Sequence, residues 1–445
     1  MMRMLRIWLL AALLTGCGLQ GQAQQYYMNV HSGGKTISYP VEGVDSVTFS
    51  SVQPEESQLA GPRITQTIVK EQEKATVYNI AYPSTDPYGN PVTLSGSIIL
   101  GDEVAASKHA RGMLLYNHFT VYHKAQVPSM GDLGIPLKIV GSGMIAVAAD
   151  YYGFGLTGDK NQAYCMSRHN AQASVDALIA ARQLLKGLGY TWDDYLFNCG
   201  YSEGGQTSMG VLRLCTEKYP DIRFTHTIAG AGPYDIGETY RQLVKSGETS
   251  MPSTVISTLL AYNEYCRLGF GLSELFLEPT LSKIAEYLLS KEYVQQQVEA
   301  NVATTKVHDW LTEPLFDFES TISRRFMEVF EYDNLSKGWT PHPEERISLV
   351  HNELDNSVPY ANTTQMTAFF QQHGFNVIEN GDRYRDGTVL SYHGSWDARA
   401  ISDKLGQHEF GALPFVSEII QVVCHYLDIK PWFTISAQDL EVLFH

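Results

Sequence analysis

Two short apolar runs in the first third of the chain predict strands that are buried on both faces. They occupy residues 112–116 and 144–149, and neither alternates with polar positions. Continuous runs are typical of parallel strands covered by helices on both sides, whereas strands with one solvated face alternate. Residues 75–82 do alternate, and after a turn at 86–90 the strand pattern returns over 92–100. This earlier pair is therefore predicted to be antiparallel.

Helical and strand patterns then follow one another along the chain. Apolar positions at helical spacing mark residues 174–185, and a helix-compatible run covers 206–219. Apolar strands are expected at 195–197, before that run, and at 224–229, after it. Alternation of this kind over about 150 residues predicts an α/β fold with a doubly wound, mostly parallel sheet.

This alternation stops at residue 236. Residues 236–346 contain several helical patterns and no clear strand pattern, which predicts an inserted helical cap. A strand pattern resumes at 347–351, and the last helix is expected at 415–427. We therefore expect a first part of the core at residues 62–235, the cap at 236–346 and a second part of the core at 347–445.

The N-terminal region has the pattern of an export signal. Residues 1–23 begin with basic positions and continue with an apolar stretch that is too short to span a bilayer. Leu14-Thr15-Gly16-Cys17 resembles the bacterial lipobox, in which lipidation of Cys17 would make an exported, membrane-anchored lipoprotein, periplasmic or at the cell surface. Ordinary cleavage after Ala23 would instead give a secreted soluble protein. Residues 24–61 predict a small β-hairpin arm and linker, which resembles the leader regions of exported Bacteroidetes proteins.

Charge and cysteine usage narrow the choice of partner. The net charge of −16 at pH 7 argues against nucleic acid, because nothing would offset phosphate repulsion. The six cysteines form no C-x-x-C pair, and no His/Cys cluster has the spacing of a zinc site, so no metal is expected. Beyond the N-terminal signal, we expect no other stretch to be long and apolar enough for a transmembrane helix.

Residues 200–205, Gly-Tyr-Ser-Glu-Gly-Gly, are the most informative motif. They read G-x-S-x-G between a predicted strand and a predicted helix, which is the layout of a nucleophile elbow. Glycine is needed beside the serine because side chains would clash in so tight a turn. An ordinary Gly/Ser turn is the alternative. The motif makes Ser202 the candidate nucleophile, which requires a histidine base and a carboxylate to orient that base.

The acid and the base are expected in that order after the serine. Asp355 follows the strand at 347–351 in an Asp-Asn-Ser-Val-Pro turn, with Glu353 as a competitor. His408 shortly precedes the last helix, where the fold places its base. His393, which lies in a Gly/Asp-rich insertion at 381–396, is the alternative base.

A developing negative charge on the substrate's carbonyl oxygen needs backbone donors. One is the amide of Glu203, which follows the nucleophile. The second is expected from the loop after the strand at 112–116, where Phe119 or Thr120 would supply an amide and the Thr120 hydroxyl could add a bond.

Together these motifs resemble the secretory lipase family of α/β-hydrolases over about residues 62–428. The segments that carry the resemblance are 116–120, 150–155, 200–205, 231–235, 355–359 and His408 before 413–415. The resemblance implies an α/β-hydrolase fold with a helical cap, serine-dependent hydrolysis of carboxylic esters, and no cofactor. The chain departs from the family at Phe119, where glycine is usual, and in the long segment between Asp355 and His408.

The leading interpretation is an exported serine esterase or lipase that works through an acyl-enzyme. Its substrates would be small-molecule, lipid or glycan esters. A peptidase of the prolyl-oligopeptidase type shares the elbow and the order of the three residues, although no propeller repeat is visible. A non-catalytic surface-binding lipoprotein on the same scaffold is the alternative from another class.

Overall fold

The computed structural model describes residues 27–32, 35–40, 63–70, 75–381, 384–397 and 406–439. The expected signal segment and the lipobox cysteine, Cys17, lie outside these residues. The chain divides into two units, residues 1–58 and residues 59–445. In the first unit, β1 (Tyr27–Ser32) pairs with β2 (Lys35–Pro40) as an antiparallel hairpin.

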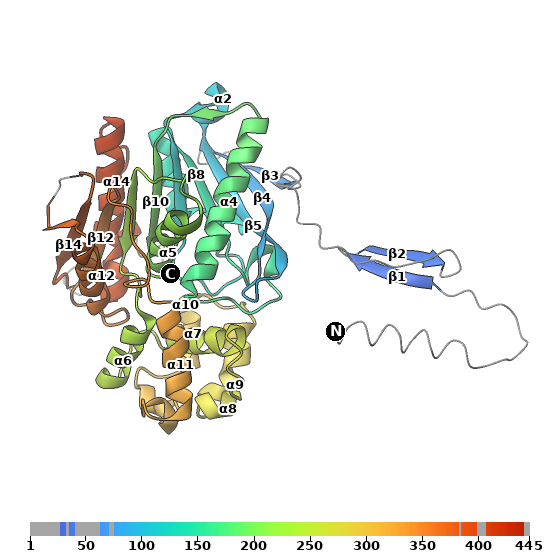
Figure 1. The fold of residues 1–445 in the computed structure, drawn as a ribbon, viewed down its shortest axis with the longest axis vertical. Helices are drawn as coiled ribbons and strands as arrows, with labels where there is room; N and C mark the ends of the chain where they lie inside the picture. The colour runs from blue at the N-terminus through green and yellow to red at the C-terminus, as the bar shows by residue number, and fades with distance from the viewer. Residues whose placement is uncertain are drawn as a thin grey trace, which may run out of the picture. The chain divides into compact units, whose positions relative to one another are not determined.

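The second unit is built on a ten-stranded sheet of order β13-β14-β12-β11-β10-β7-β8-β5-β4-β3 (Figure 1). β4 is antiparallel to both β3 and β5, β5 is antiparallel to β8, and the remaining neighbouring pairs are parallel. The predicted mostly parallel, doubly wound sheet is confirmed. The ten strands are β3 (Arg63–Lys70), β4 (Ala75–Thr85), β5 (Pro91–Gly101), β7 (Met113–Asn117), β8 (Ile145–Ala149), β10 (Leu196–Tyr201), β11 (His226–Gly230), β12 (Arg346–Asn352), β13 (Asn376–Glu379) and β14 (Thr388–Gly394). A separate short pair joins β6 (His109–Ala110) to β9 (Thr191–Trp192).

Helices cover both faces of the sheet because the central strands are apolar on both sides. In β7, Met113 and Leu115 face one core cluster, while Leu114 and Tyr116 face the other. Residues of α4 (Ser167–Gly187), α5 (Glu203–Lys218) and α12 (Ala361–Gln372) belong to the first cluster. Those of α3 (Gly134–Ile139) and α14 (Ala412–Leu427) belong to the second.

The last helical stretch corrects one sequence expectation. Residues Gln407–Leu427, which comprise α13 (Gln407–Phe410) and α14, are long and apolar enough to cross a membrane by length and composition alone. In the structure, 61% of the apolar window is buried. The helix packs on the sheet through side chains such as Phe415 and Ile419, so coverage of the core accounts for its apolar character.

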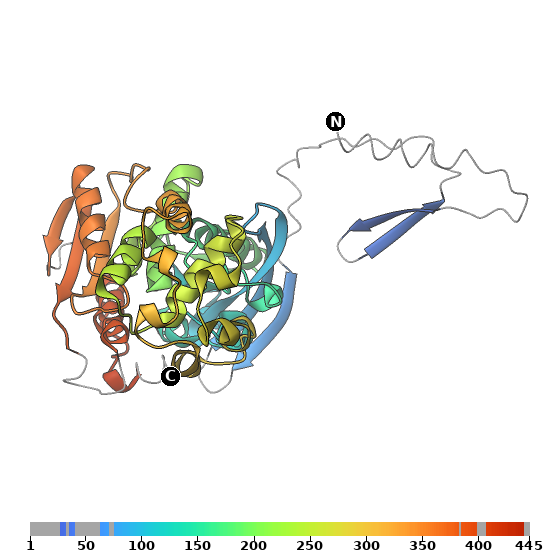
Figure 2. The same cartoon turned by 90° about the horizontal axis from the view of Figure 1, so that it is seen from below.

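Between β11 and β12 the chain forms a group of helices that gathers beyond one end of the sheet (Figures 1 and 2). They are α6 (Ile236–Ser246), α7 (Pro252–Tyr265), α8 (Leu272–Leu275), α9 (Thr280–Ile284), α10 (Gln295–Val302) and α11 (Thr321–Tyr332). The ring of Phe330 packs against Tyr240 and Tyr262 with centroid distances of 5.8 and 4.9 Å. These aromatic side chains belong to the same buried cluster as one face of the sheet. The helical segment therefore shares its core with the sheet.

The edge of the sheet beyond β12 was not expected. The segment 381–396 reads as a Gly/Asp-rich insertion, but residues 388–394 form β14, parallel to β12 and β13. Only Val389 and Leu390 give this strand a fully buried apolar pair, which is too short a signal to predict a strand.

Candidate active site

The candidate nucleophile lies in a sharp turn between β10, which ends at Tyr201, and α5, which begins at Glu203. Ser202 has φ 58° and ψ −122°, a strained conformation that residues other than glycine rarely adopt. The turn needs glycine beside it, since a Cβ added at Gly204 would lie 2.1 Å from the carbonyl oxygen of Asn117. A Cβ at Gly200 would lie 2.2 Å from the carbonyl oxygen of Gly204. The two glycines thus let the elbow pack directly against the end of β7.

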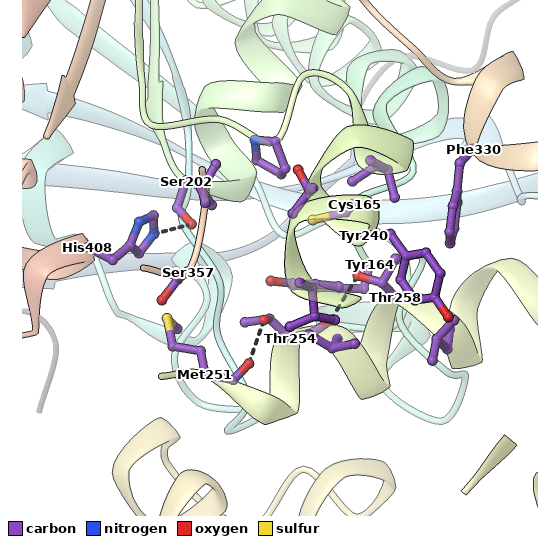
Figure 3. A pocket seen from close by; sticks show the side chains of 17 residues that line it. Tyr164, Cys165, Ser202, Tyr240, Met251, Thr254, Thr258, Phe330, Ser357 and His408 are labelled. Carbon is purple, nitrogen blue, oxygen red and sulfur yellow. Dashed lines mark hydrogen bonds between the residues drawn. The ribbon is translucent and has the colours of Figure 1, made fainter. Parts of the chain in front are cut away.

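The structure brings Ser202, His408 and Asp355 together from three distant parts of the chain. His408 Nε2 lies 2.8 Å from Ser202 Oγ (Figure 3), and His408 Nδ1 lies 2.6 Å from Asp355 Oδ2. Ser202 follows β10, Asp355 follows β12, and His408 lies in α13. Because the carboxyl ends of parallel strands meet at one edge of the sheet, residues far apart in sequence converge there.

The carboxylate of Asp355 is held in its charged form. Its Oδ1 accepts hydrogen bonds from the amides of Ser357 and Val358, each at 2.9 Å, and His351 Nε2 lies 3.3 Å from its Oδ2. Burial alone would raise the pKa of Asp355. The charges and hydrogen bonds of His408 and His351 outweigh burial and hold this pKa well below its usual range.

The interaction with Asp355 also shifts the pKa of the His408 imidazole. Burial alone would lower the pKa of His408, but the charge and the hydrogen bond of Asp355 outweigh burial and raise it above the ordinary value of 6.5. A hydrogen bond from Nδ1–H to the carboxylate leaves Nε2 as the acceptor that faces the Ser202 hydroxyl. The arrangement can therefore take a proton from Ser202 and stabilise the imidazolium that results.

The competing acid and base form a separate pair. His393, at the end of β14, has its Nδ1 2.6 Å from Glu353 Oε1, and Ser395 also donates to Glu353. Both side chains are partly exposed, with 17% and 34% of their surfaces accessible. Of the two candidate bases, it is His408 that lies within hydrogen-bond distance of Ser202.

The first expected oxyanion donor is the amide of Glu203. Glu203 is the first residue of α5, so its N–H has no partner within the helix and lies where the helix dipole favours negative charge. Its side chain has a different role. The carboxylate is buried and its Oε1 accepts hydrogen bonds from the amide of Cys165 at 3.1 Å and from Asn170 at 3.2 Å. Burial raises the pKa of this carboxyl to about 7, despite both hydrogen bonds.

The second expected donor loop follows β7. Phe119 has its carbonyl oxygen 2.7 Å from His118 Nδ1, and the Thr120 hydroxyl lies 2.8 Å from the hydroxyl of Tyr164. Thr120 is buried, and Tyr164 stands between it and the pocket described below. The structure thus connects Thr120 to the site through a tyrosine.

A mostly apolar pocket opens beside Ser202 and His408 (Figure 3). Its empty space, including the mouth open to solvent, is about 630 Å³. The core contributes Tyr164, Cys165, Ser202, Pro233, Ser357, Val358 and His408, and the helical segment contributes Ile236, Thr239, Tyr240, Leu243, Met251, Thr254, Val255, Thr258, Leu259 and Phe330. In the view of Figure 3, Phe330 and Tyr240 lie at the opposite end of the lining from Ser202 and His408. Within the described part of the chain, no group of three or more His, Cys, Asp or Glu side chains could hold a metal ion.

Sequence reasoning missed Tyr164 and Cys165. They lie in irregular chain between β8 and α4, where no periodic pattern exists. The only available signal was their position after the loop at 150–155, which carries part of the family resemblance.

Comparison with known proteins identifies the family. The sequence profile described as "Secretory lipase" matches residues 132–393, more than half of the chain. The chain belongs to the secretory lipase family. Family membership indicates a hydrolase that acts on esters and suggests export from the cell. The family does not address the expected lipid anchor.

Solved structures show the same fold. The cell-wall-degrading esterase LipA of Xanthomonas oryzae is 22% identical, with a TM-score of 0.65 over 80% of this chain and 92% of that one. Candida antarctica lipase A is 15% identical, with a TM-score of 0.59 over 85% of each chain. Among curated protein sequences, no relative matches the chain. These neighbours establish an α/β-hydrolase fold.

Proposed function

We propose that this secretory lipase family member is an exported serine esterase whose catalytic residues are Ser202, His408 and Asp355. The single observation that supports this most strongly is the bridging imidazole, which lies 2.8 Å from the serine oxygen and 2.6 Å from the carboxylate. A serine hydroxyl is a poor nucleophile near neutral pH, and an oriented histidine base is the usual way to activate it.

In the proposed reaction, Ser202 Oγ attacks the ester carbonyl carbon while His408 Nε2 takes the hydroxyl proton. The tetrahedral intermediate carries its negative charge on the former carbonyl oxygen, which the amide of Glu203 and an amide of Phe119 or Thr120 bind. His408 then gives its proton to the leaving alcohol, and an acyl-enzyme remains on Ser202. A water molecule repeats the sequence and releases the acid.

The acyl group of the substrate would occupy the pocket beside Ser202. Its lining is dominated by apolar side chains from α6 and α7, such as Ile236, Leu243 and Val255, which favour an aliphatic or aromatic acyl group over a charged one. The helices therefore form an acyl-binding cap over the core. In this proposal, residues 62–235 and 347–445 form the two parts of the core, and residues 236–346 form the cap.

The proposed location is the outside of the cytoplasmic membrane, with a lipid anchor on Cys17. Support comes from the lipobox-like segment and from the export that the family suggests. Mass spectrometry of the mature protein would detect an N-terminal diacylglyceryl cysteine. An N-terminus beginning after Ala23 would contradict the anchor.

A fluorophosphonate probe and a substrate panel test the catalytic proposal. The wild-type protein should label at Ser202 and hydrolyse p-nitrophenyl esters, and Ser202→Ala should do neither while remaining folded. Aminoacyl-amides provide the comparison that separates esterase from peptidase. An unlabelled wild-type protein would indicate a non-catalytic binding protein, and faster cleavage of the amides would indicate a peptidase.

A further inference from the structure

Tyr164 connects the pocket to the loop that follows β7. Its hydroxyl lies 2.8 Å from Thr120 Oγ1, and both side chains are buried, at 3% and 4% exposure. The ring of Tyr164 also lines the pocket beside Ser202. A buried hydroxyl pair is a strong restraint, because neither partner can exchange its bond for one to water without opening the structure.

The neighbouring residue, Cys165, is held from both sides in a strained conformation. Its φ of 53° lies in the left-handed region, which a residue other than glycine occupies only when its surroundings enforce it. The amide of Cys165 donates to Glu203 Oε1 at 3.1 Å, and its carbonyl oxygen accepts from the Tyr262 hydroxyl at 3.0 Å. Contacts from α5 and from α7 thus fix the backbone beside Tyr164.

We propose that Tyr164 is a positioning residue for the oxyanion hole. This inference rests on the proposed function. The oxyanion would be bound by two segments, here called arms. One is the start of α5, with Glu203, and the other is the loop after β7, with Thr120. Residues 164–165 join these arms, since Cys165 binds the side chain of Glu203 and Tyr164 binds that of Thr120. The spacing between the arms is therefore set by the short segment between them.

The hydroxyl pair restrains Thr120 whichever of the two oxygens donates, since each hydroxyl can both donate and accept. The bond fixes the side-chain rotamer of Thr120 and, with it, the position of the loop that follows β7. Losing the tyrosine hydroxyl would loosen one arm of the oxyanion hole and leave the apolar wall of the pocket in place.

The test is Tyr164→Phe, which removes one oxygen and keeps the ring. Removal of an oxyanion donor outright costs about 10²–10³-fold in kcat. We expect displacement of a donor to cost less, about 10-fold in kcat with KM changed less than about two-fold. Tyr190→Phe is the matched control, because Tyr190 is buried, its hydroxyl lies 3.5 Å from that of Tyr78, and it is outside the site. Its kinetics should match those of the wild type.

Thr120 variants test the connection independently. Thr120→Val should reproduce the loss in kcat, Thr120→Ser should restore most of it, and Tyr164→Phe combined with Thr120→Val should be no slower than the slower single variant. Affinity for an alkyl boronic acid, which forms a tetrahedral adduct on the serine, should fall in parallel with kcat.

Three results would overturn the inference while leaving the esterase assignment intact. The first is a Tyr164→Phe enzyme with wild-type kcat, and the second is a pure increase in KM, which would make the tyrosine only a wall of the pocket. Additive losses in the double variant would also contradict it. A wild-type protein that neither hydrolyses esters nor reacts with fluorophosphonate would instead refute the proposed function, and this inference with it.

Discussion

Replacing Asp355 with asparagine removes the negative charge of the proposed catalytic acid with little change in the shape of the side chain. The Oδ1 atom that accepts the amides of Ser357 and Val358 remains, so the turn keeps its hydrogen bonds. The oxygen that faces His408 Nδ1 at 2.6 Å becomes an NH₂ group. An NH₂ group donates, so the favoured tautomer of His408 changes. Nε2 then carries the proton and cannot accept the proton of Ser202.

The expected loss follows from this change of tautomer. In a well-studied serine protease, the same exchange lowers kcat by about 10⁴-fold. At about 1.4 kcal/mol for each factor of ten, this corresponds to about 5 kcal/mol of lost transition-state stabilisation. The ring must also pack beside a neutral amide in a site where Asp355 is 9% exposed, so little water can compensate. KM should change little, because the acyl pocket is untouched.

The pH profile provides a second readout. His408 must be neutral to act as a base, and its pKa is raised above 6.5 by the charge and hydrogen bond of Asp355 working against burial. Wild-type activity should therefore decline as the pH falls through a value above 6.5. In Asp355→Asn both contributions of Asp355 disappear, while burial, which lowers the pKa, and the smaller effect of the Glu409 charge remain, so the residual activity should decline at a lower pH than that of the wild type.

Glu353→Gln is the matched control for this substitution. Glu353 is also a carboxylate bonded to a histidine, with His393 Nδ1 at 2.6 Å. We expect its kcat to stay within about two-fold of wild type, because that pair is partly exposed and does not contact Ser202. Esterase assays between pH 5 and 9, with circular dichroism to check folding, make the comparison. Equal losses in the two variants, or an Asp355→Asn enzyme that keeps a tenth of its kcat, would refute the reasoning.

Three further predictions concern residues around the pocket. Burial raises the pKa of Glu203 from 4.5 to about 7, so the unfolded state releases this proton at a lower pH than the folded state does. The free energy of unfolding should therefore fall as the pH rises through that window, by at most about 3 kcal/mol. In urea titrations, Glu203→Gln should gain stability over wild type from pH 5 to pH 8, and a constant difference would contradict this. Phe330→Leu should shift the preferred p-nitrophenyl ester toward longer acyl chains, because Phe330 lies at the far end of the pocket lining from Ser202, and an unchanged preference would contradict that placement. Cys165 should react slowly with iodoacetamide at pH 8 in the native state and rapidly in urea, because burial raises the pKa of its thiol well above 9.0, and fast native labelling would contradict the burial.

The sequence predicted those parts of the molecule in which local pattern and burial coincide. β7 and β8 are continuous apolar runs because helices cover them on both faces, and the elbow glycines are dictated by approach distances near 2 Å. The positions of Asp355 and His408 could be anticipated because strand order fixes which loops converge at the sheet edge. β14 could not, because its hydrogen bonds come from neighbouring strands while its own apolar signal is only two buried residues long.

Residues whose roles depend on tertiary contacts could not be recognised from the sequence. Tyr164 has its role because Thr120, 44 positions away, happens to face its hydroxyl. Cys165 adopts a left-handed backbone although glycine is the residue usually associated with that conformation. The family resemblance covers their surroundings, and yet it does not reveal which side chains meet.

The proposed helical cap is joined to the core by buried polar contacts. Asp333, directly after α11, accepts hydrogen bonds from the amide of Ser167 at 2.7 Å and from the hydroxyl of Tyr262 at 2.6 Å. It thereby caps the N-terminus of α4 from the cap side, where a carboxylate is favoured by the helix dipole.

Undocking the cap would leave the amides of α4 without this partner and expose the aromatic cluster around Phe330, which is fully buried. Each change costs free energy, because buried donors that lose partners and apolar surface that meets water are both unfavourable. Tyr262 also donates to the carbonyl oxygen of Cys165, so the same cap helix restrains the backbone beside the pocket. A variant that loosens α7, such as Tyr262→Phe, should therefore lower both the unfolding temperature and kcat. A loss of thermal stability with wild-type kcat would show instead that loosening the cap does not disturb the oxyanion arms.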